Sequence, residues 1–260
     1  MNAKLKSMPR SRGAQRWARW MEWLARYHRC EVVGAHNVPP TGGVVLAGTH
    51  SLASYELFIV SHFSDDVLGR TTNIIGDDLL FRMPGLGTVL RDSHFVPGRR
   101  DSAVQRLKDG DMLGIAPGGM KESLRGHGRR YTYDWSRRKG FAAVAMKAGV
   151  PVVPVCCPNA DDIFHVYDNP LTRGVYRALK VPAPVFRGRW GTPLPRPVKL
   201  VHWLGEPIHP HVPPEEVTPA AVDAFHARIT EALDALVAKA IATGDRLEGV
   251  PDVLPLGGWR

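Results

Sequence analysis

The sequence lacks any long apolar run. No stretch of 18 or more apolar residues occurs among its 260 residues, and a helix needs about 20 such residues to cross a bilayer. We therefore expect no membrane-spanning segment. The N-terminus is basic but has no apolar core, so we also expect no secretory signal peptide.

Cysteine is scarce. The chain holds three, Cys30 and the adjacent pair Cys156 and Cys157, and their spacing fits neither a disulfide framework nor a common zinc site. We therefore expect no metal ligands and a reducing, cytoplasmic-side location. The Gly-x-Ser-x-Gly turn of serine hydrolases is also missing, which argues against a serine nucleophile.

The overall composition is that of an ordinary globular protein, with 44% hydrophobic and 23% charged residues. The length suffices for one large α/β domain with a sizeable core. No internal repeat or linker divides the chain. We expect a basic amphipathic helix over residues 1–30, one domain over 31–245 and a loosely structured tail over 246–260.

Positive charge is concentrated at the N-terminus. The net charge is +9, and residues 1–29 contain eight basic residues against the single acid Glu22. Such a concentration predicts an anionic partner, either lipid head groups or nucleic acid. The basic residues are Lys4, Lys6, Arg10, Arg12, Arg16, Arg19, Arg26 and Arg29.

Aromatic and apolar residues recur at helical spacing over residues 14–29. Tryptophans between arginines are typical of a helix that lies on a membrane surface. A helix that covers the domain core and turns its arginines to solvent fits the pattern equally well, and one helix can do both. The recurring residues are Trp17, Trp20, Met21, Leu24 and Tyr27.

Short buried strands alternate with helices along the rest of the chain. This alternation predicts an α/β fold, a largely parallel mixed sheet flanked by helices. Thr218-Pro219 is a good helix start, because proline is favoured at the first helical position. Strands are expected near residues 30–33, 44–47, 71–75, 94–96, 112–116, 150–155 and 198–203.

One stretch carries an imidazole and a carboxylate between two apolar runs. Residues 44–47 indicate a buried strand, His50 follows in a turn, and Glu56 lies in the first turns of a helix. A histidine held by a carboxylate is what proton removal from a hydroxyl requires at neutral pH. Alone this signal is weak, because the chain has 11 histidines and 25 acids.

Three further blocks follow in order. They are a segment ending at Arg99-Arg100, Pro-Gly-Gly-Met-Lys-Glu at 117–122, and Val-Pro-Val-Val-Pro-Val at 150–155. Together with His50 they resemble the glycerolipid (lysophospholipid or PlsC-like) acyltransferase superfamily. The pattern there is H-X4-D, a block ending in arginine, an E-G-T-R-like block and a V-P-V-V-P-like strand. The closest likeness is to the monoacylglycerol/diacylglycerol acyltransferase-like branch, with P-G-G-x-x-E, over roughly residues 44–210.

The resemblance implies an O-acyltransferase that takes a fatty acyl group from acyl-CoA, or from an acyl carrier protein, and passes it directly to a lipid hydroxyl. It implies no cofactor beyond the acyl-CoA co-substrate. His50 would be the general base and Glu56 would hold the imidazole. The spacing here is H-X5-E, with Tyr55 in the aspartate position. His50 must therefore lie in the turn before the helix, with Glu56 reaching back.

The glycines of the third block have a candidate role in binding substrate. Without side chains, Gly118 and Gly119 let backbone N–H groups approach a phosphate or a thioester oxyanion. An ordinary turn is the alternative. Lys121 and Glu122 follow directly, the first able to bind phosphate and the second able to orient Lys121 or the acceptor, or simply to lie at the surface.

The third block also bears on whether the acceptor carries a phosphate. Where the superfamily has a phosphate-binding arginine, this chain has Met120-Lys121. We therefore expect a neutral mono- or diacylglycerol acceptor. Arg99 and Arg100 remain able to bind a phosphate of the acceptor or of CoA, or to be merely solvated. A lysophospholipid or glycerol-phosphate acyltransferase is the alternative within the same class.

Two further readings belong to other classes. A thioesterase or lipid esterase would use water in place of the acceptor at His50. A nucleic-acid-binding protein is permitted by the charge, but no recognisable motif supports it, so we expect none. The leading hypothesis is a peripheral enzyme on the cytoplasmic face of an anionic membrane, with an apolar groove near residues 79–90 for the acyl chain.

Overall fold

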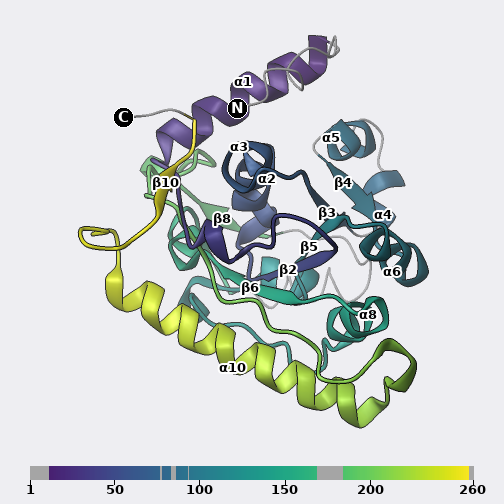
Figure 1. Ribbon diagram of the computed structural model, residues 1–260. Coiled ribbons are helices and arrows are strands. Elements are labelled where there is room, and N and C mark those ends of the chain that lie inside the picture. The colour runs from purple at the N-terminus through teal and green to yellow at the C-terminus, as the bar shows by residue number, and fades with distance from the viewer. Residues whose placement is uncertain (1–11, 77, 83–85, 93, 169–183, 258–260) are drawn as a thin grey trace.

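The computed structural model describes residues 12–76, 78–82, 86–92, 94–168 and 184–257. Its centre is an eight-stranded mixed sheet with the order β10-β1-β9-β6-β2-β5-β3-β4 (Figure 1). The strands are β1 (Glu31–Val33), β2 (Val44–Gly48), β3 (Thr72–Gly76), β4 (Phe95–Pro97), β5 (Met112–Ile115), β6 (Val152–Cys156), β9 (Val201–Leu204) and β10 (Val253–Pro255). Strands β7 (His165–Val166) and β8 (Phe186–Arg187) form a separate pair.

Most neighbouring strands run parallel. Strands β4, β3, β5, β2 and β6 form one parallel run, whereas β9 is antiparallel to β6 and β10 to β1. The predicted largely parallel mixed sheet is confirmed. The parallel run places the carboxyl ends of β2, β4, β5 and β6 at one edge of the sheet, where ligands bind in open α/β sheets.

Helices cover both faces of the sheet (Figure 1). On β2, Val45 and Ala47 pack into the cluster of one helical layer, and Val44 and Leu46 into that of the other. Side chains alternate in this way because successive residues of a strand point to opposite faces. The first layer contains α6 (Arg100–Lys108), α8 (Gly140–Ala148) and α10 (Pro219–Thr243), and the second α1 (Arg12–Tyr27), α2 (Tyr55–His62) and α3 (Ser64–Leu68).

Helix α1 belongs to the core of the domain. Met21, Leu24 and Ala25 are buried beneath it, and the Trp17 ring meets the edge of Phe58 on α2 with centroids 5.7 Å apart. The helix therefore packs as one layer of the sheet domain. Lys4, Lys6 and Arg10 lie outside the described residues. None of the helices in the described residues is long and apolar enough to cross a membrane.

The expected loose tail is wrong over part of its length. Val253–Pro255 forms β10, which pairs with β1 at the edge of the sheet. Leu256 is buried, and its N–H donates to the Cys30 carbonyl at 2.9 Å. Three residues are too few for a strand period to be recognised in sequence. The pairing depends on the exposed edge that β1 offers.

Candidate active site

His50 lies just beyond the end of β2 and is buried, with 4% of its surface exposed. Its Nδ1 is 3.2 Å from the Ser51 carbonyl oxygen and 3.3 Å from Ser54 Oγ. Because a carbonyl can only accept, Nδ1 carries the proton and Nε2 is the basic nitrogen. This Nε2 is buried and has no hydrogen-bond partner among the described residues. In this tautomer the basic lone pair of the ring is on Nε2, and the Gly119 backbone raises the pKa of the ring.

Glu56 lies in the first turn of α2 and is 1% exposed. Its Oε1 accepts the Ser51 N–H at 2.9 Å, and its Oε2 accepts the Ser51 hydroxyl. The carboxylate does reach back from the helix, as the spacing required, but it binds Ser51 and not the imidazole. Glu56 therefore fixes the residue whose carbonyl holds His50. Its role in holding the ring is indirect.

The extra residue of H-X5-E is taken up by a kink before α2. Ser54 adopts a left-handed conformation (φ 55°, ψ 32°) between a 3-10 turn over Leu52–Ser54 and the start of α2. Such a conformation costs a non-glycine residue about 1 kcal/mol or more. The kink means that His50 and Glu56 do not lie on one continuous helix.

Tyr55, which occupies the aspartate position of the family pattern, has a structural partner. Its hydroxyl is 3.0 Å from His28 Nε2, and His28 Nδ1 is 2.8 Å from the Val198 carbonyl. The carbonyl requires a proton on Nδ1, so Nε2 accepts from the tyrosine. Tyr55 thereby ties the start of α2 to the segment that follows α1, which explains why it does not serve His50.

Burial controls the protonation of the His50 and Glu56 pair. It lowers the pKa of His50, while the negative charge of Glu56 raises it. Burial also raises the pKa of Glu56, and the hydrogen bonds from Ser51 lower it. Because burial has the largest effect on His50, the imidazole is neutral at neutral pH. A neutral ring is the form that can accept a proton.

Glu122 anchors the loop that carries His50. This residue of α7 (Gly119–Ser123) is buried, and its Oε1 accepts the His50 backbone N–H at 2.8 Å. Its Oε2 accepts the Trp135 indole N–H at 3.0 Å. A surface role for Glu122 is therefore wrong. Each oxygen accepts a bond inside the protein, and the expected role of Glu122 in orienting Lys121 or the acceptor stays a prediction.

The two glycines of the third block, Gly118 and Gly119, are required for different structural reasons. A Cβ atom at Gly118 would lie 1.8 Å from Glu122 Oε2, so only glycine leaves room for that carboxylate. Gly119 has φ +54° and donates its N–H to the Ala116 carbonyl at 3.1 Å. That N–H is consequently not open to a substrate oxyanion in this conformation. Lys121, on the same short helix, is exposed.

Arg99 and Arg100 lie farther from His50. They precede and begin α6, beyond the end of β4, and both are exposed. Strand β4 is three strands away from β2, a separation of about 14 Å at the usual strand spacing. Arg99 Nε is 3.8 Å from Asp78 Oδ2. Both arginines share the sheet edge with His50, and their binding of phosphate stays a prediction.

Arg125 is a site residue that the sequence did not reveal. It is nine-tenths buried, and its Nη2 donates to Asp161, with Oδ2 at 2.6 Å. Its Nη1 lies 3.9 Å from Glu122 Oε1. In the sequence, 125–130 reads as a polar loop. The three-residue spacing from Glu122 was the available signal, but Asp161 comes from beyond β6 and only the fold brings it close.

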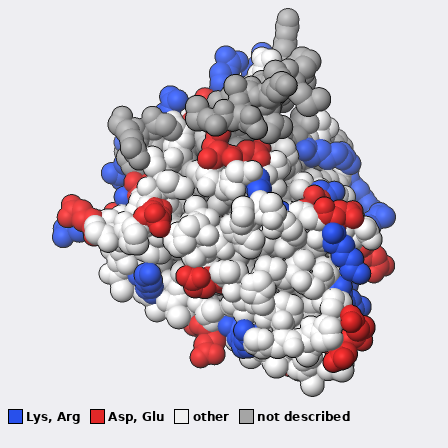
Figure 2. Space-filling view, in the orientation of Figure 1, with Lys and Arg blue, Asp and Glu red and all other residues white. Residues whose placement is uncertain are grey.

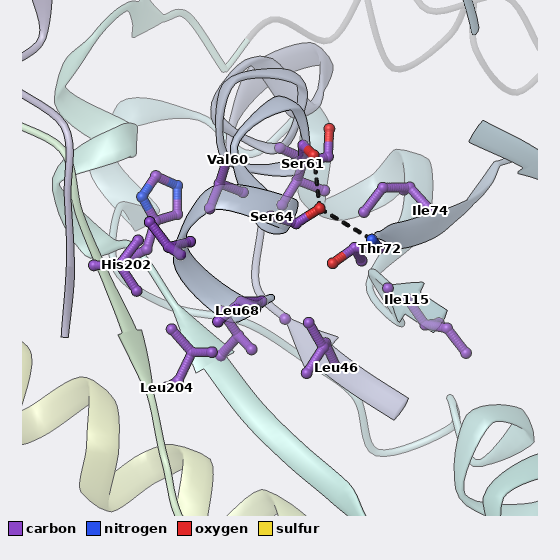
Figure 3. Close-up of a pocket in the computed structure, with 16 residues that line it drawn as sticks. Leu46, Val60, Ser61, Ser64, Leu68, Thr72, Ile74, Ile115, His202 and Leu204 are labelled. Atoms are coloured by element: carbon purple, nitrogen blue, oxygen red, sulfur yellow. Dashed lines mark hydrogen bonds between the residues drawn. The ribbon is translucent and has the colours of Figure 1, made fainter. Parts of the chain in front are cut away.

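An apolar cavity lies under α2 and α3, next to the His50 loop (Figure 3). It has an empty volume of about 590 Å³, part of which is open to solvent. Gly48 and Leu57 line it and bracket the stretch from His50 to Glu56. The labelled lining residues of Figure 3 are Leu46, Val60, Ser61, Ser64, Leu68, Thr72, Ile74, Ile115, His202 and Leu204.

The cavity does not lie where an acyl groove was expected. None of its lining residues comes from 79–90. Phe81 and Leu90 from that segment are instead buried with Ile74 and Phe95 in a small cluster of their own, and residues 83–85 lie outside the described part of the chain. The cavity is lined from strands and helices far apart in the chain, and sequence periodicity does not show such an arrangement.

The family described as "Acyltransferase" matches residues 29–158, which is half of the chain and spans β1 through β6. The chain belongs to this acyltransferase family. The match covers His50, Glu56 and the three further blocks that suggested the glycerolipid acyltransferase superfamily. That resemblance is thereby confirmed.

Relatives of this acyltransferase include proteins whose names refer to lipid synthesis. The "DGAT1/2-independent enzyme synthesizing storage lipids" from Bos taurus is 31% identical over 217 residues, covering 81% of this chain and 62% of that protein. Its Homo sapiens counterpart is 30% identical and the match covers 64% of it. "Diacylglycerol O-acyltransferase 2" from Mus musculus is 25% identical over 89% of this chain. The chain spans about three fifths of the length of these relatives.

A solved structure shares the fold. The crystal structure of the 1-acyl-sn-glycerophosphate (LPA) acyltransferase PlsC from Thermotoga maritima aligns with a TM-score of 0.54 at 17% identity. The alignment covers 91% of this acyltransferase and 85% of that chain. At this identity the likeness establishes the architecture alone.

Proposed function

We propose that this acyltransferase moves a fatty acyl group from an acyl-CoA thioester to the hydroxyl of a neutral glycerolipid, with His50 as general base. The observation that carries the proposal is the buried, unpartnered Nε2 of His50 in a ring whose Nδ1 proton is held by Ser51. A lone pair of this kind accepts a hydroxyl proton, and burial keeps the ring neutral.

The reaction needs no covalent enzyme intermediate. The acceptor hydroxyl gives its proton to His50 Nε2 while its oxygen bonds to the thioester carbonyl carbon. The carbon–sulfur bond then breaks, and the leaving thiolate takes the proton from the imidazolium. The negative charge of Glu56 stabilises that imidazolium. Its carboxylate also holds Ser51, whose carbonyl keeps the ring in the productive tautomer.

The apolar cavity is the proposed site of the acyl chain. Its lining includes Gly48 and Leu57, which flank the His50 to Glu56 stretch in the chain, and other lining residues come from α2 and from the sheet. Figure 3 shows Val60 and Ser61 of α2 and Leu46 of β2 among them. Burial of an acyl chain against such a surface is favourable by roughly 0.8 kcal/mol per methylene. The exposed Arg99, Arg100 and Lys121 at the same sheet edge are available to phosphates of CoA. An acyl carrier protein is the alternative donor.

A neutral acceptor is favoured by the relatives whose names refer to storage lipids and to diacylglycerol. The lysophospholipid alternative is favoured by the name of the PlsC structure. The two differ in whether a phosphate must be bound. A panel of monoacylglycerol, diacylglycerol, lysophosphatidate and glycerol 3-phosphate with one acyl-CoA separates them. A clear preference for the phosphorylated acceptors would overturn the proposal.

Hydrolysis is the different-class alternative, and the same assay tests it. Release of CoA is measured with and without acceptor. Transfer predicts that release depends on the acceptor and that ester product accumulates in equal amount. Release that is independent of acceptor would indicate a thioesterase. No recognisable motif favours nucleic-acid binding, and basic and acidic side chains are interspersed on the face drawn in Figure 2.

The outer face of α1 is the proposed membrane contact, on the cytoplasmic side. Trp20 and Trp23 are 52% and 48% exposed, and their rings stack with centroids 5.0 Å apart. The exposed Arg16, Arg19 and Arg26 lie on the same helix. Indole rings beside arginines suit the head-group region of an anionic bilayer, where each basic residue adds about 1 kcal/mol. Helix α1 would then both cover the core and dock on lipid.

Co-sedimentation with vesicles tests this contact. Vesicles of phosphatidylcholine with and without phosphatidylserine are compared for the wild type and for the double variant Trp20→Ala, Trp23→Ala. Ile241→Ala is the control, because Ile241 is 47% exposed but lies on α10, in the other helical layer. We expect the tryptophan variant alone to lose binding. Equal binding by all three would refute the contact.

A further inference from the structure

A second, polar pocket adjoins the His50 loop. Its empty volume is about 290 Å³, much of it open to solvent, and it lies between the segments that follow β5 and β6. Two of its walls belong to the active site: Leu52 lies two residues after His50, and Glu122 holds the His50 backbone N–H. The polar residues of its lining are Glu122, Arg125, His127, Arg130 and Asp161.

This pocket contains buried donors without acceptors. Arg125 Nε and Nη1 and His127 Nδ1 are buried, and none has a hydrogen-bond partner among the described residues. His127 Nε2 is 2.8 Å from Arg130 Nη1, which can only donate, so the proton of His127 is on Nδ1. Three nitrogen donors therefore remain unsatisfied. A buried donor left without an acceptor destabilises the fold, which indicates a ligand with acceptor oxygens.

The charges around these donors are already balanced. Arg125 lies between Asp161, which it binds, and Glu122, 3.9 Å from its Nη1. Arg130 Nε is 3.9 Å from Asp162 Oδ1. A phosphate entering here would place further negative charge beside two buried or half-buried carboxylates, which repel it. An uncharged hydroxyl or ester carbonyl gains the same hydrogen bonds without that cost.

We propose that Arg125 and His127 bind uncharged oxygens of the acceptor, the free hydroxyl or the ester carbonyl of an acylglycerol, and so select a neutral acceptor over a phosphorylated one. The inference rests on the proposed acyl transfer and adds the residues that recognise its acceptor. Asp161 and Glu122 are part of the selection, because they hold Arg125 and exclude an anion.

Acceptor kinetics of three variants test the inference. Arg125→Lys keeps the charge near Asp161 but removes Nε and Nη1 as donors. His127→Ala removes the third donor at a half-buried position. Arg129→Lys is the matched control, since Arg129 is an exposed neighbour in the same segment. KM and kcat are measured for monoacylglycerol, for lysophosphatidate and for acyl-CoA.

We expect Arg125→Lys and His127→Ala each to raise the KM for monoacylglycerol about tenfold, the value of one lost hydrogen bond from a charged or buried donor. The KM for acyl-CoA and all constants of Arg129→Lys should stay at wild-type values. An unchanged KM for monoacylglycerol in both variants would overturn the inference. So would a rise confined to acyl-CoA or to lysophosphatidate, which would indicate a phosphate site. A wild type that transfers acyl groups to no acceptor would instead refute the proposed function itself.

Discussion

Replacement of Glu56 by glutamine separates the two ways in which this residue acts on His50. The amide oxygen can still accept the Ser51 N–H, and the Ser51 hydroxyl can rotate to accept from the amide. The Ser51 carbonyl, which fixes the imidazole tautomer, should therefore stay in place. What the variant loses is the negative charge that raises the pKa of His50.

The expected loss in kcat depends on whether the variant loses the tautomer of His50 or only the charge of Glu56. In a Ser-His-Asp triad, asparagine in the third position costs about 10⁴ in kcat because the wrong tautomer forms. Here the tautomer is kept by a carbonyl, so only the stabilisation of the imidazolium is lost. One to two pKa units of stabilisation correspond to about 1.4–2.7 kcal/mol, which predicts a loss of about 10- to 100-fold in kcat.

The assay is the pH profile of kcat/KM for acyl transfer. Because the Glu56 charge raises the pKa of His50, its removal should move the acid limb of the profile to lower pH. Asp66→Asn is the control, since Asp66 is an exposed acid on the neighbouring α3. A loss near 10⁴ would mean that the carboxylate contacts the ring during turnover. A loss below twofold with no shift would mean that Glu56 is neutral, and either result refutes the reasoning.

Three further predictions follow from the buried groups, the cavity and α1. Burial lowers the pKa of His28 and His202 to about 4, so between about pH 6.5 and pH 4 both histidines bind protons only in the unfolded protein. The free energy of unfolding should therefore fall by about 2 kcal/mol per histidine from pH 8 to pH 5. A free energy of unfolding by urea that does not change with pH would contradict this. Val60→Phe should narrow the cavity and shift kcat/KM at least tenfold toward shorter acyl-CoA chains, whereas an unchanged chain-length profile would place the acyl chain elsewhere. Trp20→Ala with Trp23→Ala should weaken vesicle binding by roughly 1 kcal/mol per indole, and undiminished binding would exclude this helix face.

The layout of the sheet was predictable because apolar runs and their breakers are local signals. The start of α10 is one example: Thr218 accepts the Ala221 N–H at its side chain, with Pro219 in the first helical position, as the sequence indicates. Strand β10 was missed for the opposite reason. Its pairing depends on an edge supplied by β1, more than two hundred residues earlier.

The candidate site also has one part that the sequence predicts and one part that it does not. His50 and the third block could be found from their order and their resemblance to a family. Their contacts could not, because Glu56 binds Ser51 through a left-handed kink at Ser54 that no spacing rule anticipates. Glu122 illustrates a further limit, because Lys121 beside it is exposed while Gly118 makes room to bury the Glu122 carboxylate.

Arg125 was hidden by its surroundings. It begins a segment rich in arginine and glycine, which is typical of a solvated loop. Its burial depends on Asp161, which the fold brings from the end of β6. Residues that acquire partners only through tertiary contacts of this kind have no signal in one sequence.

The measurement that tests the central claim most directly is acyl transfer by His50→Ala. Its backbone N–H can still donate to Glu122, so the loop and the fold should be retained, as thermal unfolding will check. His211→Ala, at an exposed position, is the control. Loss of a general base predicts a fall in kcat of about 10²–10⁴-fold or more for His50→Ala, with the control unchanged. Wild-type kcat in a folded His50→Ala protein would contradict the account.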